Sequence, residues 1–224
     1  MNLQKTPPGI TAGEPGKSLA QTAYEELKIK ILTLEFEPGS YLNEATATKI
    51  LNIGRNPIHN AVKRLVFEGL IEIIPRKGMI IKSVQLGEIL EVAEARIINE
   101  AFCARKAAER ASGSDIKSMQ QIINDSYIAL KANDTKAQMF LDRDFHCAIF
   151  KAAGNSVLED MLRVLHERSL RNWFISLREP AQAARVYEQH SAILEAIKAK
   201  DPEDASRQMI AHIEASRSVL ANQP

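Results

Sequence analysis

Four side chains of metal-binding types lie on apolar faces of the segments that carry them. Asp142 and His146 stand four positions apart, which places them on one face of a helix beside Phe145. His190 and His212 occur in later segments with the same apolar periodicity. Burying one carboxylate and three imidazoles without partners is costly, whereas both group types are metal ligands. The pattern therefore predicts a divalent metal in a helical core.

Zinc is the first expectation for this donor set, and nickel or manganese also suits nitrogen and oxygen ligands. A competing interpretation remains, because a single buried histidine is more often a satisfied core residue. In that case the histidines, or a bound metal, would only stiffen the core. The residues leave the role of His166 open, since it has no counterpart in the four-residue set. Its position after Leu162 and Leu165 allows it to line the cavity of the bundle.

The elements that must position these residues are helices. From Gln85 onward the apolar spacing is helical throughout, and breaks such as Ser112-Gly113 and Asp201-Pro202 divide the segment. Short connections predict an antiparallel all-helical bundle. The expected helices are 86–111, 114–132, 134–153, 155–177, 181–199 and 202–221.

The preceding segment has a different pattern. A helix is expected from Ser18 to about Glu35, and a short one follows Asn43. The next helix begins at Asn56-Pro57 after a tight turn, which indicates a helix-turn-helix. β-Branched residues on both sides of Pro75 to Gly78 predict a hairpin with a basic tip. Together they predict a winged helix-turn-helix. The alternative is a hairpin that only packs against the helices and does not act as a wing.

The third helix of this head has the composition of a DNA-reading helix. Its outward positions are polar, and Arg and Asn can bind guanine and adenine edges in the major groove. Basic residues here and at the hairpin tip suit phosphates, which position the protein. The predicted DNA-binding residues are Arg55, Asn56, His59, Lys63, Arg64, Arg76, Lys77 and Gly78.

Composition narrows the function classes. The 224 residues are 45% hydrophobic and 25% charged, which is typical of a globular protein rather than a disordered one. No apolar run reaches membrane-spanning length, and the start lacks a secretory signal, so a cytoplasmic protein is expected. Residues 1–85 carry 11 Lys or Arg against 8 Asp or Glu, whereas the rest is slightly acidic. This favours a polyanion-binding head. The predicted divisions are a flexible tail (1–17), the winged helix (18–84) and the bundle (85–221).

The head resembles the winged helix of the GntR family of bacterial transcription regulators. The matches run in register and include Pro38-Gly39, Glu44, Arg55, Arg64 and Gly78. The resemblance implies that Arg55 and Arg64 contact DNA. His59 stands where the family has a contacting arginine, so its role stays open.

The bundle resembles the FCD (FadR C-terminal) ligand-binding domain of the FadR subgroup, in its shorter six-helix, VanR-like branch. The resemblance is carried by EARIINE at 94–100, DRDFHCAIFKAAGN at 142–155, and HSAILEAI at 190–197 with the later His212-Ile213. It implies that Asp142, His146, His190 and His212 are the metal ligands. It also implies that an organic acid shares the metal, with Arg96 as a candidate partner. Asn155 is a weaker one, because a helix N-cap explains it as well.

The expected function is that of a DNA-binding regulator, in first place a repressor. Its affinity for a double-stranded operator would be controlled by a small organic acid at the metal. Two alternatives differ in class: a metal-dependent enzyme, and a helical protein with a structural metal and no effector response. No H-E-x-x-H helix occurs, and an enzyme would have no use for a DNA-binding head, so no enzyme is expected. A homodimer is expected, because a palindromic site needs two heads.

Overall fold

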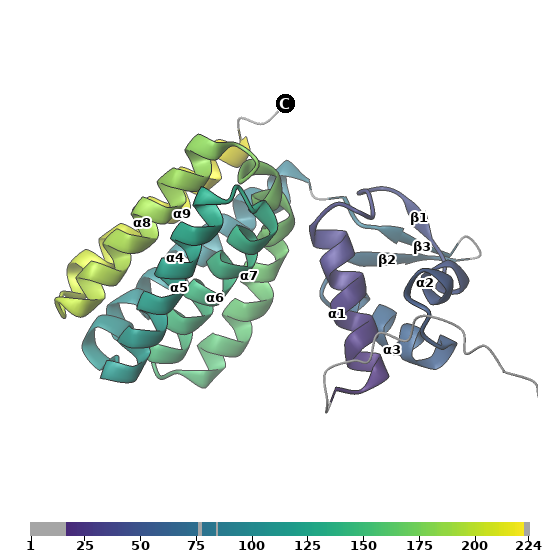
Figure 1. Cartoon of the computed structure of the whole chain (residues 1–224), viewed down its shortest axis with the longest axis horizontal. Coiled ribbons are helices and arrows are strands. Elements are labelled where there is room, and N and C mark those ends of the chain that lie inside the picture. The colour runs from purple at the N-terminus through teal and green to yellow at the C-terminus, as the bar shows by residue number, and fades with distance from the viewer. Residues whose placement is uncertain (1–16, 76–77, 84, 222–224) are drawn as a thin grey trace, which may run out of the picture. The chain divides into compact units, whose positions relative to one another are not determined.

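The computed structural model describes residues 17–75, 78–83 and 85–221, and within them the chain divides after Ser83 into two compact units (Figure 1). The expected tail, apart from Lys17, lies outside the described residues, as do the wing residues Arg76 and Lys77. Among the described helices, none combines the length and apolar character that crossing a bilayer requires.

The first unit is a winged helix-turn-helix, which confirms the predicted fold. Its elements are α1 (Leu19–Leu32), β1 (Tyr41–Leu42), α2 (Glu44–Leu51), α3 (Arg55–Phe67), β2 (Ile71–Ile74) and β3 (Gly78–Ile81). The strands form an antiparallel sheet with the order β1-β3-β2. Apolar residues of α1 and α3 close the core of this unit, among them Leu27 and Leu65.

Three local details differ from the prediction. Helix α1 ends at Leu32, before the expected Glu35, and Leu34 then takes a left-handed backbone conformation. Helix α3 begins at Arg55 with Gly54 as its N-cap, so the expected cap at Asn56 is wrong. Pro57 still lies in the first turn, where a missing N–H does no harm. Strand β1 was not predicted, because two residues are too short to show a strand period.

The second unit is all-helical in its described residues, and every predicted helix is present within a residue or so of its expected bounds. The helices are α4 (Leu86–Arg110), α5 (Gly113–Lys131), α6 (Thr135–Ala152), α7 (Ser156–Ser176), α8 (Pro180–Lys198) and α9 (Pro202–Ala221). Their starts follow capping chemistry: Ser112 and Asp115 form a capping box, and Asp134 caps α6. Helix α4 packs against α9, and α5 against α6.

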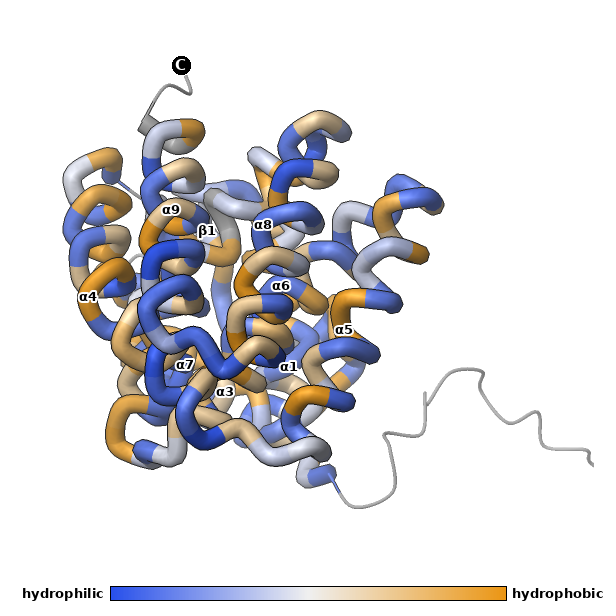
Figure 2. Tube along the Cα trace, turned by 90° about the vertical axis from the view of Figure 1, so that its left-hand side faces the viewer, coloured by the Kyte–Doolittle hydropathy of each residue, from blue (hydrophilic) through white to orange (hydrophobic). Residues whose placement is uncertain are grey.

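Each helix of the second unit is amphipathic, so hydrophobic and hydrophilic residues alternate around its turns (Figure 2). The apolar faces meet in a core with Met119, Phe145 and Phe150 fully buried. Within the described residues, the same unit also buries seven Arg, Glu, Asp and His side chains from the helices α4, α6, α7, α8 and α9. They are Arg96, Glu100, Asp142, His146, His166, His190 and His212.

Candidate metal centre and nucleic-acid interface

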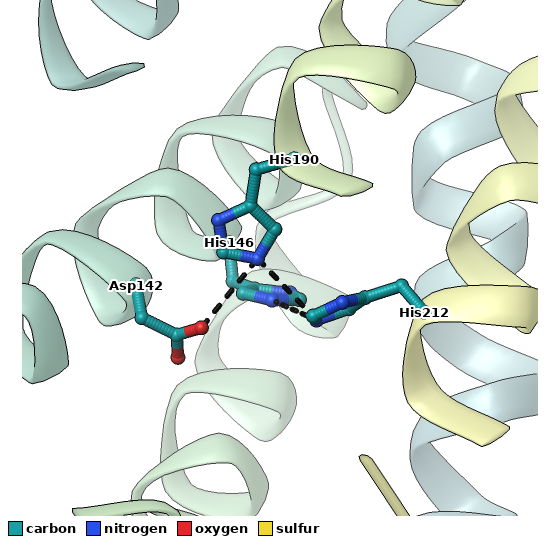
Figure 3. A group of neighbouring side chains, drawn as sticks. All are labelled: Asp142, His146, His190 and His212. Atoms are coloured by element: carbon teal, nitrogen blue, oxygen red, sulfur yellow. Dashed lines mark hydrogen bonds and ion pairs between the residues drawn. The ribbon is translucent and has the colours of Figure 1, made fainter. Parts of the chain in front are cut away.

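Three helices bring the four predicted metal ligands together inside the second unit. Asp142 and His146 project from successive turns of α6, and His190 and His212 reach the same point from α8 and α9 (Figure 3). All four side chains are buried, and one donor atom from each lies within 4.8 Å of the others.

The spacing of the donor atoms fits a divalent ion. Nε2 of His212 lies 3.3 Å from Nε2 of His146 and 3.3 Å from Nε2 of His190. Oδ1 of Asp142 lies 3.5 Å from Nε2 of His190. Zinc–nitrogen bonds of about 2.0–2.1 Å separate neighbouring ligand atoms by about 2.8–3.4 Å, from octahedral to tetrahedral geometry. The three closest donor separations are thus near those around one ion, and all four donor atoms lie within 4.8 Å of one another.

The outer nitrogens of two imidazoles are held by side chains that accept hydrogen bonds. Nδ1 of His146 donates to Oε2 of Glu100 at 2.6 Å, and Nδ1 of His212 donates to Oε1 of Gln189 at 3.0 Å. In a neutral imidazole this leaves the lone pair on Nε2. Nε2 of each ring is thereby directed at Nε2 of the other, 3.3 Å away, so two potential donor nitrogens for a metal lie side by side.

A buried ion pair supports the first of these imidazoles. Glu100, on α4, also accepts from Nε of Arg96 at 2.6 Å. Burial opposes ionisation of Glu100, but Arg96 and His146 outweigh it and lower its pKa to about 2. Glu100 is thus an anion inside the bundle, and its hydrogen bond orients the ring of His146. Metal-binding histidines are commonly oriented by a carboxylate that accepts a hydrogen bond from the other ring nitrogen.

The protonation states of the other donors also suit a metal. Burial, followed by the charges of neighbouring groups, holds the pKa of His190 and of His212 well below the usual range, so both rings are neutral. Burial raises the pKa of Asp142 despite His146 and Arg96 nearby. Nε1 of Trp173 donates to Oδ1 of Asp142 at 3.0 Å and fixes that carboxyl group. A divalent ion would favour the carboxylate form that burial disfavours.

His166 lies beside this group but does not belong to it. It is fully buried on α7, and its ring centroid is 4.6 Å from that of His146. Nε2 of His166 is 3.5 Å from Oδ2 of Asp142, and neither ring nitrogen has a hydrogen-bond partner. The sequence placed His166 next to apolar residues of its helix but did not reveal this proximity to Asp142.

The two residues predicted to meet an effector lie in different settings. Arg96 is buried, donates from Nη1 to Oγ of Ser169 at 3.0 Å, and lines a pocket with Arg168 and Arg217. Asn155 is the N-cap of α7, where its side chain accepts from the backbone N–H of Leu158. A second pocket, whose lining includes Gln138 and Tyr187, reaches Asp142 and His190 directly.

The reading helix of the first unit presents its polar residues outward, as predicted. Ile58, Ala61, Val62 and Leu65 are buried. The opposite face exposes Arg55, Asn56, His59, Lys63 and Arg64.

Glu44, at the start of α2, contacts two of these exposed residues. Its Oε1 lies 2.7 Å from Nδ1 of His59, and its Oε2 lies 3.6 Å from Nε of Arg55. The hydrogen bond with His59 is the largest cause of a lowered pKa for Glu44. Glu44 therefore holds both side chains at the exposed start of α3.

Two other predicted DNA-contacting residues have evident structural roles. The guanidinium of Arg64 lies 3.6 Å above the ring of Tyr24 and donates to Oε1 of Gln21, which ties α3 to α1. Gly78 has φ +104, and a Cβ there would lie 3.3 Å from the backbone oxygen of Leu42. Only glycine fits this point of the sheet without strain.

Sequence reasoning missed the residues that support the metal centre: Glu100, Trp173 and Gln189. Glu100 stands four positions after Arg96, a spacing equally typical of a solvent-exposed ion pair. Gln189 precedes His190, but its side chain serves His212, a relation that depends on how α8 packs against α9. No local pattern in the sequence reveals such contacts.

Comparisons with known proteins agree with this architecture. The FCD domain family matches residues 91–215, and the family of bacterial regulatory proteins named gntR matches residues 19–81. The chain is 25% identical over 206 residues to the HTH-type transcriptional repressor RspR of Escherichia coli K12, covering 92% of this chain and 90% of that one. It is 27% identical to the HTH-type transcriptional repressor GlaR of the same organism, covering 85% and 90%.

A solved structure gives the same fold. The structure of E. coli McbR/YncC superposes with a TM-score of 0.81 at 21% identity, covering 91% of this chain and 97% of that one. The likeness extends over both units of the chain, each of which therefore has a known counterpart.

Proposed function

We propose that this chain, which belongs to the GntR family of bacterial regulatory proteins and carries an FCD domain, is a repressor controlled by a metal-bound organic acid. Family and relatives are transcription regulators rather than enzymes, so the enzyme alternative is excluded. In this proposal residues 18–84 bind operator DNA in the cytoplasm, and residues 85–221 bind the metal and the acid.

One observation carries the metal part of the proposal: four buried donor atoms, from Asp142, His146, His190 and His212, lie within 4.8 Å of one another. Glu100 and Gln189 hold the rings of His146 and His212 so that Nε2 of each faces the other. Asp142 and His190 add an oxygen and a nitrogen at matching separations. Zinc fits best, and nickel and manganese are the other candidates.

The acid would join the site from the side that the protein donors leave open. When bound, the metal supplies a Lewis acid that holds a carboxylate oxygen. The charge of Arg96 is balanced by Glu100, but Arg168 and Arg217 line the same pocket and add positive charge that suits an acid.

The contacts of Glu100 and Arg96 give a route by which the centre affects the rest of the chain. Both lie on α4, the first helix after the boundary at Ser83. A change in the position of His146 acts on Glu100, and through Arg96 on Ser169 of α7. We infer that acid binding alters operator affinity by shifting α4.

The experiment that tests this function combines composition with DNA binding. Metal analysis of the purified chain should find one divalent ion per chain, and mass spectrometry should identify a co-purified carboxylic acid. Adding the acid to the metal-loaded chain should change operator affinity, measured by fluorescence anisotropy. His190→Ala, which lacks one ligand, should show no response. An unchanged affinity in the loaded wild type would leave only a structural metal.

A homodimer is part of the proposal. A winged helix reads a short half-site, and two heads about one helical turn apart double the sequence that is read. Sedimentation of the chain with and without operator DNA tests this. A mass of 24.9 kDa in both samples at micromolar concentration would contradict it.

A further inference from the structure

His166 is the buried polar side chain that the proposed metal centre does not use. Its side chain is 1% exposed, and both ring nitrogens are without partners. A neutral imidazole has one N–H to donate and one lone pair to satisfy. Unpaired buried groups of this kind are rare in native proteins, so a partner is expected.

The nearest acceptor within the protein cannot be that partner. Oδ2 of Asp142 lies 3.5 Å from Nε2 of His166, which is too long for a hydrogen bond. Oδ1 of the same carboxyl faces His190 and Trp173 instead. His166 therefore points its Nε2 at the edge of the metal centre without completing any contact there.

His166 is also not arranged as a fifth metal ligand. The donor atoms that lie within 4.8 Å of one another belong to Asp142, His146, His190 and His212. The imidazole of His166 lies beside His146, with ring planes 41° apart and no hydrogen bond between the rings. His166 therefore lies beside the donor set rather than within it.

The surroundings favour an anion as the missing partner. Ser169, one turn after His166 on α7, donates to the backbone oxygen of His166 and accepts from Nη1 of Arg96. This chain of contacts fixes a buried guanidinium beside the His166 turn. That guanidinium is already paired with Glu100, so the group that still requires an acceptor is the N–H of His166, and a carboxylate oxygen is a strong one.

We propose that His166 is a recognition residue of the effector site and donates from Nε2 to a carboxylate oxygen of the metal-bound organic acid. This inference rests on the proposed function, because it requires an acid at the metal. The competing explanation is an ordered water between His166 and Asp142, which would satisfy the same atoms without any part in acid binding.

Two substitutions of His166 test the inference in the zinc-loaded full chain. His166→Leu removes the donor, whereas His166→Gln keeps an N–H near the position of Nε2. Calorimetric titrations with acetate, malate and citrate give affinities, and elemental analysis gives metal content. We expect both variants to retain one metal per chain. His166→Leu should weaken acid binding about tenfold or more, because a charge-assisted hydrogen bond is lost. His166→Gln should retain most of the wild-type affinity for the acid.

The outcomes separate this inference from the proposed function. Wild-type acid affinity in His166→Leu would favour the water and overturn the inference alone. Loss of metal in both variants would show that His166 is a metal ligand, which would also overturn the inference alone. A loaded wild type that binds none of the three acids would overturn the inference and the proposed function together. Acid binding that leaves operator affinity unchanged would overturn only the regulatory function. If His166→Leu unfolds, the acid affinities of wild type, His166→Gln and His166→Ala are compared instead. Equal affinities in all three would overturn the inference.

Discussion

Nδ1 of His146 and Oε2 of Glu100 lie 2.6 Å apart, although one residue is on α6 and the other on α4. A helix that contributes no ligand to the proposed centre thus fixes the ring of a ligand. Because Glu100 also binds Arg96, the orientation of His146 depends on an ion pair that is sealed inside the bundle.

Glu100→Gln should weaken metal binding while preserving the shape of the side chain. The amide cannot supply the negative charge that raises the basicity of the His146 ring. Substituting a residue that hydrogen-bonds to a metal-binding histidine typically lowers the affinity for the metal about 10- to 100-fold. Competition with a chelator of known affinity measures the change. Glu94→Gln, an exposed position on the same helix, is the control and should bind metal like wild type.

The same carboxylate should make stability depend on pH in the acid range. The pKa of Glu100 is about 2 in the folded chain, against 4.5 for an ordinary glutamate. The unfolded chain therefore takes up a proton first as the pH falls, and its population grows. The stability that Glu100 contributes is complete above pH 4.5 and decreases towards pH 2.

Denaturant titrations of the metal-free chain at several pH values from 6 to 3 check this expectation. Wild type should lose more unfolding free energy over the range than Glu100→Gln does. Parallel curves for the two proteins would contradict the assigned charge on Glu100.

Single substitutions of the five histidines should separate those that hold the metal from those that do not. His146→Ala, His190→Ala and His212→Ala should each abolish stoichiometric metal, because each removes one of the converging nitrogens. His166→Ala and the exposed His59→Ala should keep a full metal complement. Elemental analysis after gel filtration provides the measurement. Full metal in His190→Ala, or its loss in His166→Ala, would refute the four-ligand assignment.

Removing the metal should lower the thermal stability of the second unit. Without the ion, four polar donor groups stay clustered inside an apolar core, which is unfavourable. Chelation should therefore reduce the melting temperature of wild type, and adding zinc should restore it. His190→Ala, already without stoichiometric metal, should melt at the same temperature with and without chelator. An equal shift in both proteins would show that the chelator acts elsewhere.

Two exposed residues of α3 should affect DNA binding differently. Arg55→Ala should weaken binding to the specific site by about 1–3 kcal/mol if Arg55 contacts a base. Lys63→Ala should weaken specific and random DNA alike and flatten the salt dependence, as loss of a phosphate contact does. Anisotropy titrations on both DNA types at several salt concentrations separate the two roles. Equal effects of the two substitutions on specific and on random DNA would contradict separate roles for Arg55 and Lys63.

The sequence predicts whatever depends on spacing along one helix. Asp142 and His146 share a face because helical positions four apart do, and their apolar neighbours point that face inward. The contact between Glu100 and His146 instead depends on how α4 packs against α6, and that packing has no local signature. The unbonded position of His166 likewise becomes visible only when α6 and α7 are in place. Strand β1 exists only through its pairing with β3.

The order of the ligands along the chain has a consequence for biosynthesis. His212 follows His146 by 66 residues, which a ribosome adds in about 3–13 s at about 5–20 residues per second. During that time Asp142 and His146 are already synthesised, but the opposing nitrogen that completes the centre does not yet exist. Helix α4 likewise lacks α9, its packing partner. In the proposed centre, binding of an ion by all four ligands therefore has to wait until α9 has been synthesised.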